Sequence, residues 1–207
     1  MKVLTFDIEI KNCIQGKDEE RDPRYQYCGG WKDPDGMGIS VLCAYASWLE
    51  EYRYFDENNL VDFVSLVAEA DVITGFNIFG FDVPLLKATL TRLGHSEKTG
   101  MAGKCYDPFG DIKQTIGNFP KGWSLDNIAQ ATFGMAKTED GANAPRFWQD
   151  GKIAQLYNYV TQDVKLEAML FQHVLDGIPI SCGDGSAPIT LTGIKKWQDF
   201  AIVEAHE

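Results

Sequence analysis

The sequence contains no apolar run close to the roughly 20 residues that a membrane-spanning helix needs. Its first segment, MKVLTFDIE, has one lysine, and acidic residues interrupt the apolar stretch too early for a signal peptide. These two absences argue against both a membrane partner and export. We therefore expect an intracellular protein of the cytoplasm.

Several common catalytic and binding motifs are also missing. The five cysteines are odd in number and widely spaced, with no CxxC pair, which argues against a disulfide framework and a zinc ribbon. We expect free thiols, with Cys43 in the core. There is no P-loop and no GxGxxG, and the three histidines are scattered without a Ser-His-Asp or Cys-His arrangement.

Positive charge is scarce, with 19 lysines and arginines against 30 acidic residues and a net charge of −11. Such an excess normally counts against a nucleic-acid partner. It describes the whole molecule, however, and an acidic metal cluster would account for part of it. The length of 207 residues and the 44% of hydrophobic residues are typical of one soluble globular domain, which we expect to cover residues 1–207.

The predicted elements follow the order of a mixed α/β domain. VLTFDIEI predicts a buried first strand, ISVLCAYASW and EYRYFD predict a hairpin, and DVITGFN predicts a short strand. Apolar residues at helical spacing predict four helices, over residues 58–70, 81–94, 124–134 and 152–177.

The remaining segments have weaker signals. DIKQTI is interpreted as a strand, KTEDGANAPRFW as a loop, and IPISC with ITLTG as a terminal hairpin, with Trp197 and Phe200 packing the tail on the body. Residues 11–38 are polar and rich in turn-forming residues, so we expect a solvated surface loop there. A lid and a partner site are the alternatives.

Two carboxylates, Asp7 and Glu9, lie two residues apart in the apolar first strand, so they point to the same face of the sheet. An Asp-x-Glu pair arises often by chance in so acidic a chain, and the alternative is a solvated strand edge. Phe6 and Ile8 on the opposite face make this strand too apolar for that. Because like charges in a half-buried site disfavour each other's ionisation, we expect a cation between them.

Two further patterns contain acidic residues. In GFNIFGFDVPLL, Asp82 opens a helix directly after a short strand, where it could also serve as a helix cap. In YVTQD, Tyr159 and Asp163 are four residues apart and share one face of the longest predicted helix. A simple surface contact is the alternative for this pair, but the helix is amphipathic, which places Asp163 at the border of its buried face.

Taken together, FDIE, GFNIFGFD and YVTQD resemble the three motifs of the DEDD exonucleases. The third motif begins with tyrosine, as in the DEDDy branch. GFNIFGFDVPLL is particularly similar to the second motif in the proofreading domains of family-B DNA polymerases. The resemblance spans roughly residues 1–177, and residues 11–38 and 178–207 do not match the family pattern. It implies a ribonuclease-H-like fold, a mixed β-sheet flanked by α-helices.

The resemblance also implies a function for individual residues. It gives the four metal-binding carboxylates as Asp7, Glu9, Asp82 and Asp163, with Tyr159 orienting the attacking water. Oxygen ligands of this kind suit two Mg²⁺ or Mn²⁺ ions, which activate a water and stabilise the leaving oxygen. The expected activity is that of a stand-alone 3′–5′ exonuclease. It would release 5′-mononucleotides from single-stranded DNA, preferred over RNA, in some cases with a replication or repair protein as partner.

Substrate contacts are predicted from the resemblance and from composition. The resemblance places Asn77 and Phe81 near the terminal nucleotide. Lys121 and Trp123, just before a predicted helix, are expected to lie along the substrate groove. Further aromatic or basic candidates are Phe79, Phe147, Lys104, Lys113, Lys137 and Arg146. Two other functions stay open: an endonuclease on the same fold, and a non-catalytic nucleic-acid-binding or scaffold module.

Overall fold

The computed structural model describes residues 1–95, 99–117, 120–135 and 143–194. They contain one five-stranded mixed sheet with the strand order β3-β2-β1-β4-β5. β1 pairs antiparallel with β2 and parallel with β4, which places it at the centre. The strands are β1 Val3–Ile10, β2 Ile39–Ala46, β3 Glu51–Phe55, β4 Val72–Thr74 and β5 Cys105–Tyr106.

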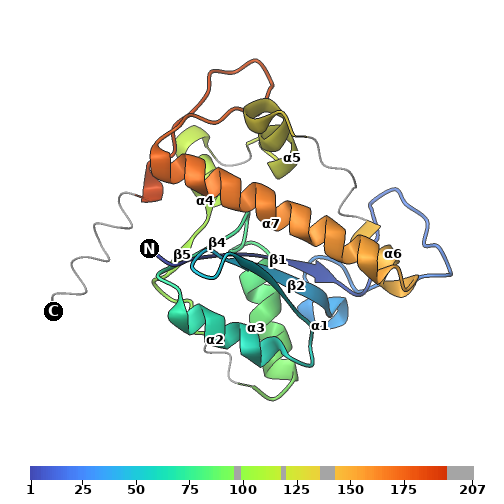
Figure 1. The fold of residues 1–207 in the computed structure, drawn as a ribbon. Coiled ribbons are helices and arrows are strands. Elements are labelled where there is room, and N and C mark those ends of the chain that lie inside the picture. The colour runs from blue at the N-terminus through green and yellow to red at the C-terminus, as the bar shows by residue number, and fades with distance from the viewer. Residues whose placement is uncertain (96–98, 118–119, 136–142, 195–207) are drawn as a thin grey trace.

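Helices cover both faces of this sheet (Figure 1). One face of β1, with Phe6 and Ile8, packs against α2 and α3. The other face packs against the long helix α7, which runs across the sheet. The helices are α1 Pro34–Met37, α2 Leu60–Glu69, α3 Asp82–Arg92, α4 Pro108–Ile116, α5 Leu125–Ile128, the π-helical turn Ala129–Phe133, α6 Ala144–Gln149 and α7 Ile153–Asp176.

This architecture confirms the predicted fold class and most of the predicted elements. The first strand, the hairpin and the four helices lie where the hydrophobic periodicity placed them. The five cysteines are free, and Cys43 is completely buried. The pairing of the two C-terminal segments consists of one antiparallel bridge between Ile180 and Ile189. No helix in the described part of the chain is long and apolar enough to cross a membrane.

Two of the predicted elements are wrong. DIKQTI is not a strand, because it lies within helix α4. Asp107 caps that helix by accepting a hydrogen bond from Phe109 N, and Pro108 occupies its first position, where proline favours a helix start. The predicted loop KTEDGANAPRFW contains α6 at its C-terminal end. Trp197 and Phe200 lie outside the described residues.

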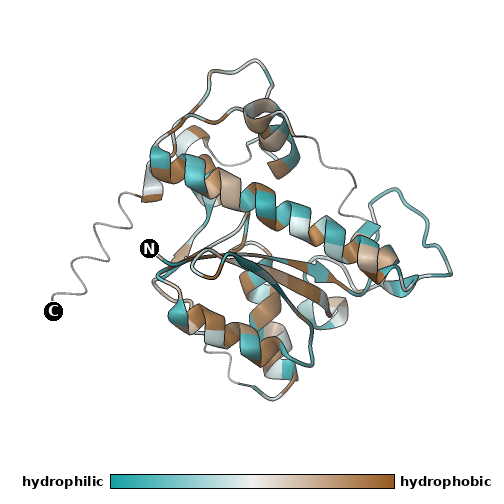
Figure 2. Ribbon diagram, viewed as in Figure 1, coloured by the Kyte–Doolittle hydropathy of each residue, from teal (hydrophilic) through white to brown (hydrophobic). Residues whose placement is uncertain are grey.

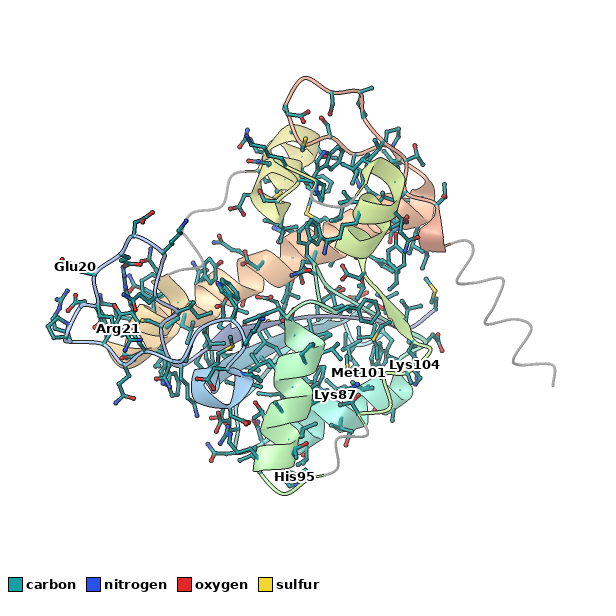
Figure 3. The ribbon with its side chains drawn as sticks, turned by 180° about the vertical axis from the view of Figure 1, so that it is seen from behind. Glu20, Arg21, Lys87, His95, Met101 and Lys104 are labelled. Carbon is teal, nitrogen blue, oxygen red and sulfur yellow. The ribbon has the colours of Figure 1, made fainter. Side chains whose placement is uncertain are left out.

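Residues 11–38 are largely exposed, as their composition predicts, but they are also tied to the body of the protein. The segment projects beside α6 (Figure 1), and its hydrophilic colouring in Figure 2 agrees with its polar composition. Figure 3 shows Glu20 and Arg21 at its outer edge. Its inner side is fixed to the body of the protein, because Gln149 on α6 donates hydrogen bonds to the carbonyls of Lys11 and Gln26, at 2.8 and 3.1 Å.

Candidate active site

Three carboxylates from two distant parts of the chain meet on the α7 face of the sheet. Asp7 and Glu9 lie on β1 and Asp163 on α7, and each offers an oxygen within 4.8 Å of the others. Asp163 is buried, whereas Asp7 and Glu9 are half-buried. Three carboxylate oxygens this close favour a bound divalent cation, and hard oxygen ligands suit Mg²⁺ or Mn²⁺. The chemistry of the donor set therefore fits the predicted metals.

The alternation of side chains along β1 explains how the first pair reaches this position. Phe6 and Ile8 are 0% and 2% exposed on the opposite face, so Asp7 and Glu9 must point toward α7. The predicted sharing of one face by the two carboxylates is confirmed. Cys43 lies opposite Asp7 on β2 and belongs to the apolar cluster under α7, so the carboxylates sit at the border of a hydrophobic core.

Asp82 is held against the same strand by a buried hydrogen bond. It is the first residue of α3, and its carboxylate accepts from the backbone N–H of Ile8 at 3.0 Å. Phe81, not Asp82, occupies the N-cap position of α3, so Asp82 is not the N-cap residue of its helix. Burial raises the pKa of Asp82 well above its usual range, and the charge of Asp7 raises that pKa further.

Tyr159 lies one helical turn before Asp163 and is 4% exposed. Its ring packs in the apolar cluster between α7 and β2. Burial raises the pKa of its phenol, and the nearby charges of Glu9 and Asp163 act in the same direction. The hydroxyl therefore keeps its proton at neutral pH and is able to donate a hydrogen bond into the site.

The loop that connects β4 to α3 passes close to β1. A Cβ atom at Gly75 would lie only 2.5 Å from the carbonyl oxygen of Phe6, so glycine is required there. Asn77 has the left-handed backbone angle φ of 66°. The buried carboxylate of Asp107 accepts from the N–H of Asn77 at 2.9 Å, which fixes this turn of the loop.

The sequence reasoning missed two buried carboxyl groups that support the site. Asp107 could have been found from Asp-Pro, which is a helix-start signal. Glu167 could have been found from its position four residues after Asp163, on the same face of α7. Glu167 accepts from Phe76 N at 3.0 Å, and burial raises its pKa well above the usual range. Asp7 and Asp82 add to that shift.

The acidic cluster opens into a pocket of about 600 Å³, within the range of about 300–1,000 Å³ typical of ligand sites. The predicted residues Asn77 and Phe81 line it, together with the metal-site residues and Tyr159. Segment 11–38 supplies another wall. Its lining residues are Cys13, Ile14, Gln15, Gly16, Glu19 and Trp31.

Arg146 on α6 is the one cation among the described lining residues. A guanidinium nitrogen of Arg146 lies 2.6 Å from a carboxylate oxygen of Glu19. The Nε of Arg146 is buried and has no hydrogen-bond partner in the described part of the chain. Arg146 thus places a positive charge, paired with Glu19, at the wall of the pocket.

The other predicted substrate contacts lie away from this pocket. Trp123 is 4% exposed and packs in the hydrophobic cluster around the C-terminal half of α7, so it offers no face to a base. Lys121 is exposed on a turn outside the pocket lining. Trp123 is unavailable for stacking because it turns inward to fill the core, whereas Lys121 lies on the exposed turn beside it. Lys104 instead donates to the carbonyls of Val67 and Ala68, and Lys137 lies outside the described residues.

A family model for the RNase H superfamily matches residues 43–176, well over half of the sequence. The chain belongs to this superfamily. The matched span includes Asp82, Tyr159 and Asp163, whereas the β1 pair Asp7 and Glu9 precedes it. Membership agrees with the mixed sheet flanked by helices, and it supports a nuclease function in general terms.

Solved structures give a second comparison. The family B DNA polymerase from the hyperthermophilic archaeon Pyrobaculum calidifontis is similar to this RNase H superfamily member, with a TM-score of 0.63 and 25% sequence identity. The match covers 84% of this chain and 24% of the polymerase, so the chain spans about a quarter of that protein's length. A search of curated protein sequences returned no match.

Proposed function

We propose that this protein is a metal-dependent 3′–5′ exonuclease that acts on single-stranded nucleic acid, with DNA preferred over RNA, and releases 5′-mononucleotides. The observation that carries this proposal is the convergence of Asp7, Glu9 and Asp163 within 4.8 Å, at a pocket that Asp82 and Tyr159 also line. Superfamily membership and the likeness to a family B DNA polymerase support a nuclease of this kind.

In this proposal the four carboxylates Asp7, Glu9, Asp82 and Asp163 hold two Mg²⁺ or Mn²⁺ ions. When bound, such ions supply an activated water and neutralise charge on the leaving oxygen. The chain's own contribution is to hold the carboxylates in place, since Asp82 is fixed to Ile8 N by a hydrogen bond of 3.0 Å.

Tyr159 is proposed to orient the attacking water. Its phenol is protonated at neutral pH, as expected from the ordinary tyrosine pKa of about 10, and burial with the neighbouring acidic groups raises that pKa further. The hydroxyl can therefore donate a hydrogen bond. The ring is fixed by its packing between α7 and β2. A donor held in one position lowers the entropic cost of placing the water.

The proposed substrate contacts are limited to the residues that line the pocket. Asn77 and Phe81 belong to the loop before α3, and Arg146 faces them from α6. Arg146 would contact a phosphate oxygen of the strand, because a guanidinium binds phosphate in a directional manner.

A nuclease assay on 5′-labelled single-stranded DNA and RNA tests the proposal. We expect a ladder that shortens from the 3′ end with Mg²⁺ or Mn²⁺. The ladder should be absent with EDTA and absent in Asp7→Ala. Faster shortening of DNA than of RNA would support the proposed preference. Arg53→Ala serves as a matched charge-changing control, because Arg53 lies on β3 outside the pocket and pairs with Glu51 at 3.1 Å.

Two results would favour the alternatives. Cleavage of a circular single strand would indicate an endonuclease, since an exonuclease leaves a circle intact. Binding of single strands without turnover under any of these metal conditions would indicate a non-catalytic binding module.

A further inference from the structure

Trp31 is an exposed tryptophan at the mouth of the pocket. Its side chain is 74% exposed, the largest fraction among the exposed large hydrophobic residues of the described chain. It lines the pocket together with Phe81, and the two rings meet edge to face with their centroids 5.9 Å apart and an interplanar angle of 69°. One edge of the indole is therefore fixed, while most of its surface faces solvent.

Packing does not account for this tryptophan. A large aromatic ring stabilises a fold in proportion to the apolar surface that it buries, and Trp31 buries only about a quarter of its surface. The indole thus presents a large apolar face inside a pocket that also holds the acidic cluster. A ligand with a flat aromatic group would cover that face.

The turn that carries Trp31 is held in place from both sides. The carboxylate of Asp33 accepts from Gly29 N at 2.7 Å and from Gly36 N at 2.9 Å, so it spans the turn. Upstream, Cys28 N donates to the carbonyl of Cys13 at 3.0 Å, which joins the turn to the start of the segment, three residues after β1 ends. A residue on such a turn keeps its position relative to the carboxylates.

The rest of the segment is fixed to α6. Gln149 accepts from Gln26 N at 2.7 Å and donates to the carbonyl of Gln26 at 3.1 Å. The contact of Arg146 with Glu19, at 2.6 Å, forms a second link. Segment 11–38 therefore forms a wall of the pocket that is held in place by these contacts. A wall held in one position is suitable for binding a ligand.

We propose that Trp31 stacks on the base of the 3′-terminal nucleotide, with Phe81 as the second aromatic surface beside it. The inference rests on the proposed function and adds the residue that holds the nucleotide to be released. Every base has an aromatic face, so this contact selects for the presence of a base and tolerates any sequence. Alanine substitution of one stacking aromatic commonly weakens binding about 5- to 100-fold.

Binding measurements test the stacking independently of turnover. Fluorescence anisotropy would give the Kd of two 5′-labelled single strands with Ca²⁺ present, one with a normal 3′ end and one whose last residue is abasic. We expect Trp31→Ala to raise the Kd of the normal strand about 5- to 100-fold and to change that of the abasic strand less than 2-fold. Trp31→Phe should recover most of the affinity, since phenylalanine retains a stacking face.

Trp48→Ala is the matched control. Trp48 is a partly buried tryptophan near the turn between β2 and β3, beside Lys2 and outside the pocket lining. It should bind both strands as the wild type does. Circular dichroism and thermal melting of each variant would show that the fold is kept.

The possible results separate the two proposals. Equal Kd values of Trp31→Ala and wild type for the normal strand would overturn the stacking, and so would an equal loss on both strands, which would indicate a structural role. A wild type that binds neither strand would also overturn it. A wild type that discriminates the two ends through Trp31 but never shortens DNA would retain the stacking and refute the exonuclease. In an active enzyme, Trp31→Ala should raise KM about as much as Kd, with a smaller change in kcat.

Discussion

Gly75 allows the loop of the second motif to pass against the central strand, and its replacement by alanine tests that close approach. In Gly75→Ala the new Cβ would lie 2.5 Å from the carbonyl oxygen of Phe6 and 2.6 Å from Cγ2 of Ile78. Real Cβ contacts are longer than 3.0 Å, so one partner must move. β1 is paired on both sides, with β2 and with β4, and therefore cannot yield easily.

The expected cost follows from two opposing terms. Overpacking against a fixed backbone costs about 3 kcal/mol, at the upper end of the usual range. Alanine also restricts the unfolded chain, which returns up to about 1 kcal/mol. We therefore expect Gly75→Ala to lower the free energy of unfolding by about 2 kcal/mol. It should also weaken the site, because the displaced loop leads directly to Asp82.

Urea denaturation in EDTA and the 3′-shortening assay would measure the two effects. Gly110→Ala is the matched control. Its Cβ would lie 3.7 Å from the nearest atom, Asp107 Cβ, an ordinary contact, and alanine in helix α4 should stabilise by up to about 1 kcal/mol. A stability of Gly75→Ala within 0.5 kcal/mol of the wild type (the usual scatter of neutral surface substitutions) would refute the close approach of loop and strand.

Substitutions at three further residues test the site and the contacts that support it. Tyr159→Phe keeps the packed ring and removes the hydroxyl, so kcat should fall about 100-fold with unchanged thermal stability, and an unchanged kcat would rule out its role in orienting water. Asp82→Asn keeps an acceptor for Ile8 N. Because the folded-state pKa of Asp82 is raised, the metal-free wild type loses stability as pH rises from about 4, so the variant should gain more in urea denaturation at pH 8 than at pH 5. The opposite order would contradict the raised pKa. Asp107→Ala removes the acceptor for Asn77 N and the cap of α4, and should cost about 1–3 kcal/mol in urea denaturation, whereas Asp107→Asn should cost less.

The main site residues could be predicted from the sequence because the position of each one depends on local periodicity. Alternation in β1 placed Asp7 and Glu9 on one face, and helical spacing placed Tyr159 and Asp163 on one face of α7. The carboxylates of β1 lie on the face that packs against α7, and Asp163 lies on the buried side of α7. Packing of α7 on the sheet therefore brings the three acidic groups together.

The sequence could not place the residues whose position depends on contacts between distant segments. Polar composition predicted the exposure of residues 11–38 but not their anchoring beside α6, which depends on Gln149, far away in the chain. Trp123, on the other hand, looked available for stacking and is buried by α7. Hydrophobicity alone does not tell whether an aromatic residue fills a core or faces a pocket.

The sequence by itself thus determined the element order, the three motifs and the face on which each carboxylate lies, since these depend on backbone periods of two and 3.6 residues. Only the tertiary structure decided which segments wall the pocket and which side chains support the motifs. Asp107 reaches Asn77 across 30 positions and Glu167 reaches Phe76 across 91. Such contacts form only after the sheet and α7 have packed, and no local pattern encodes them.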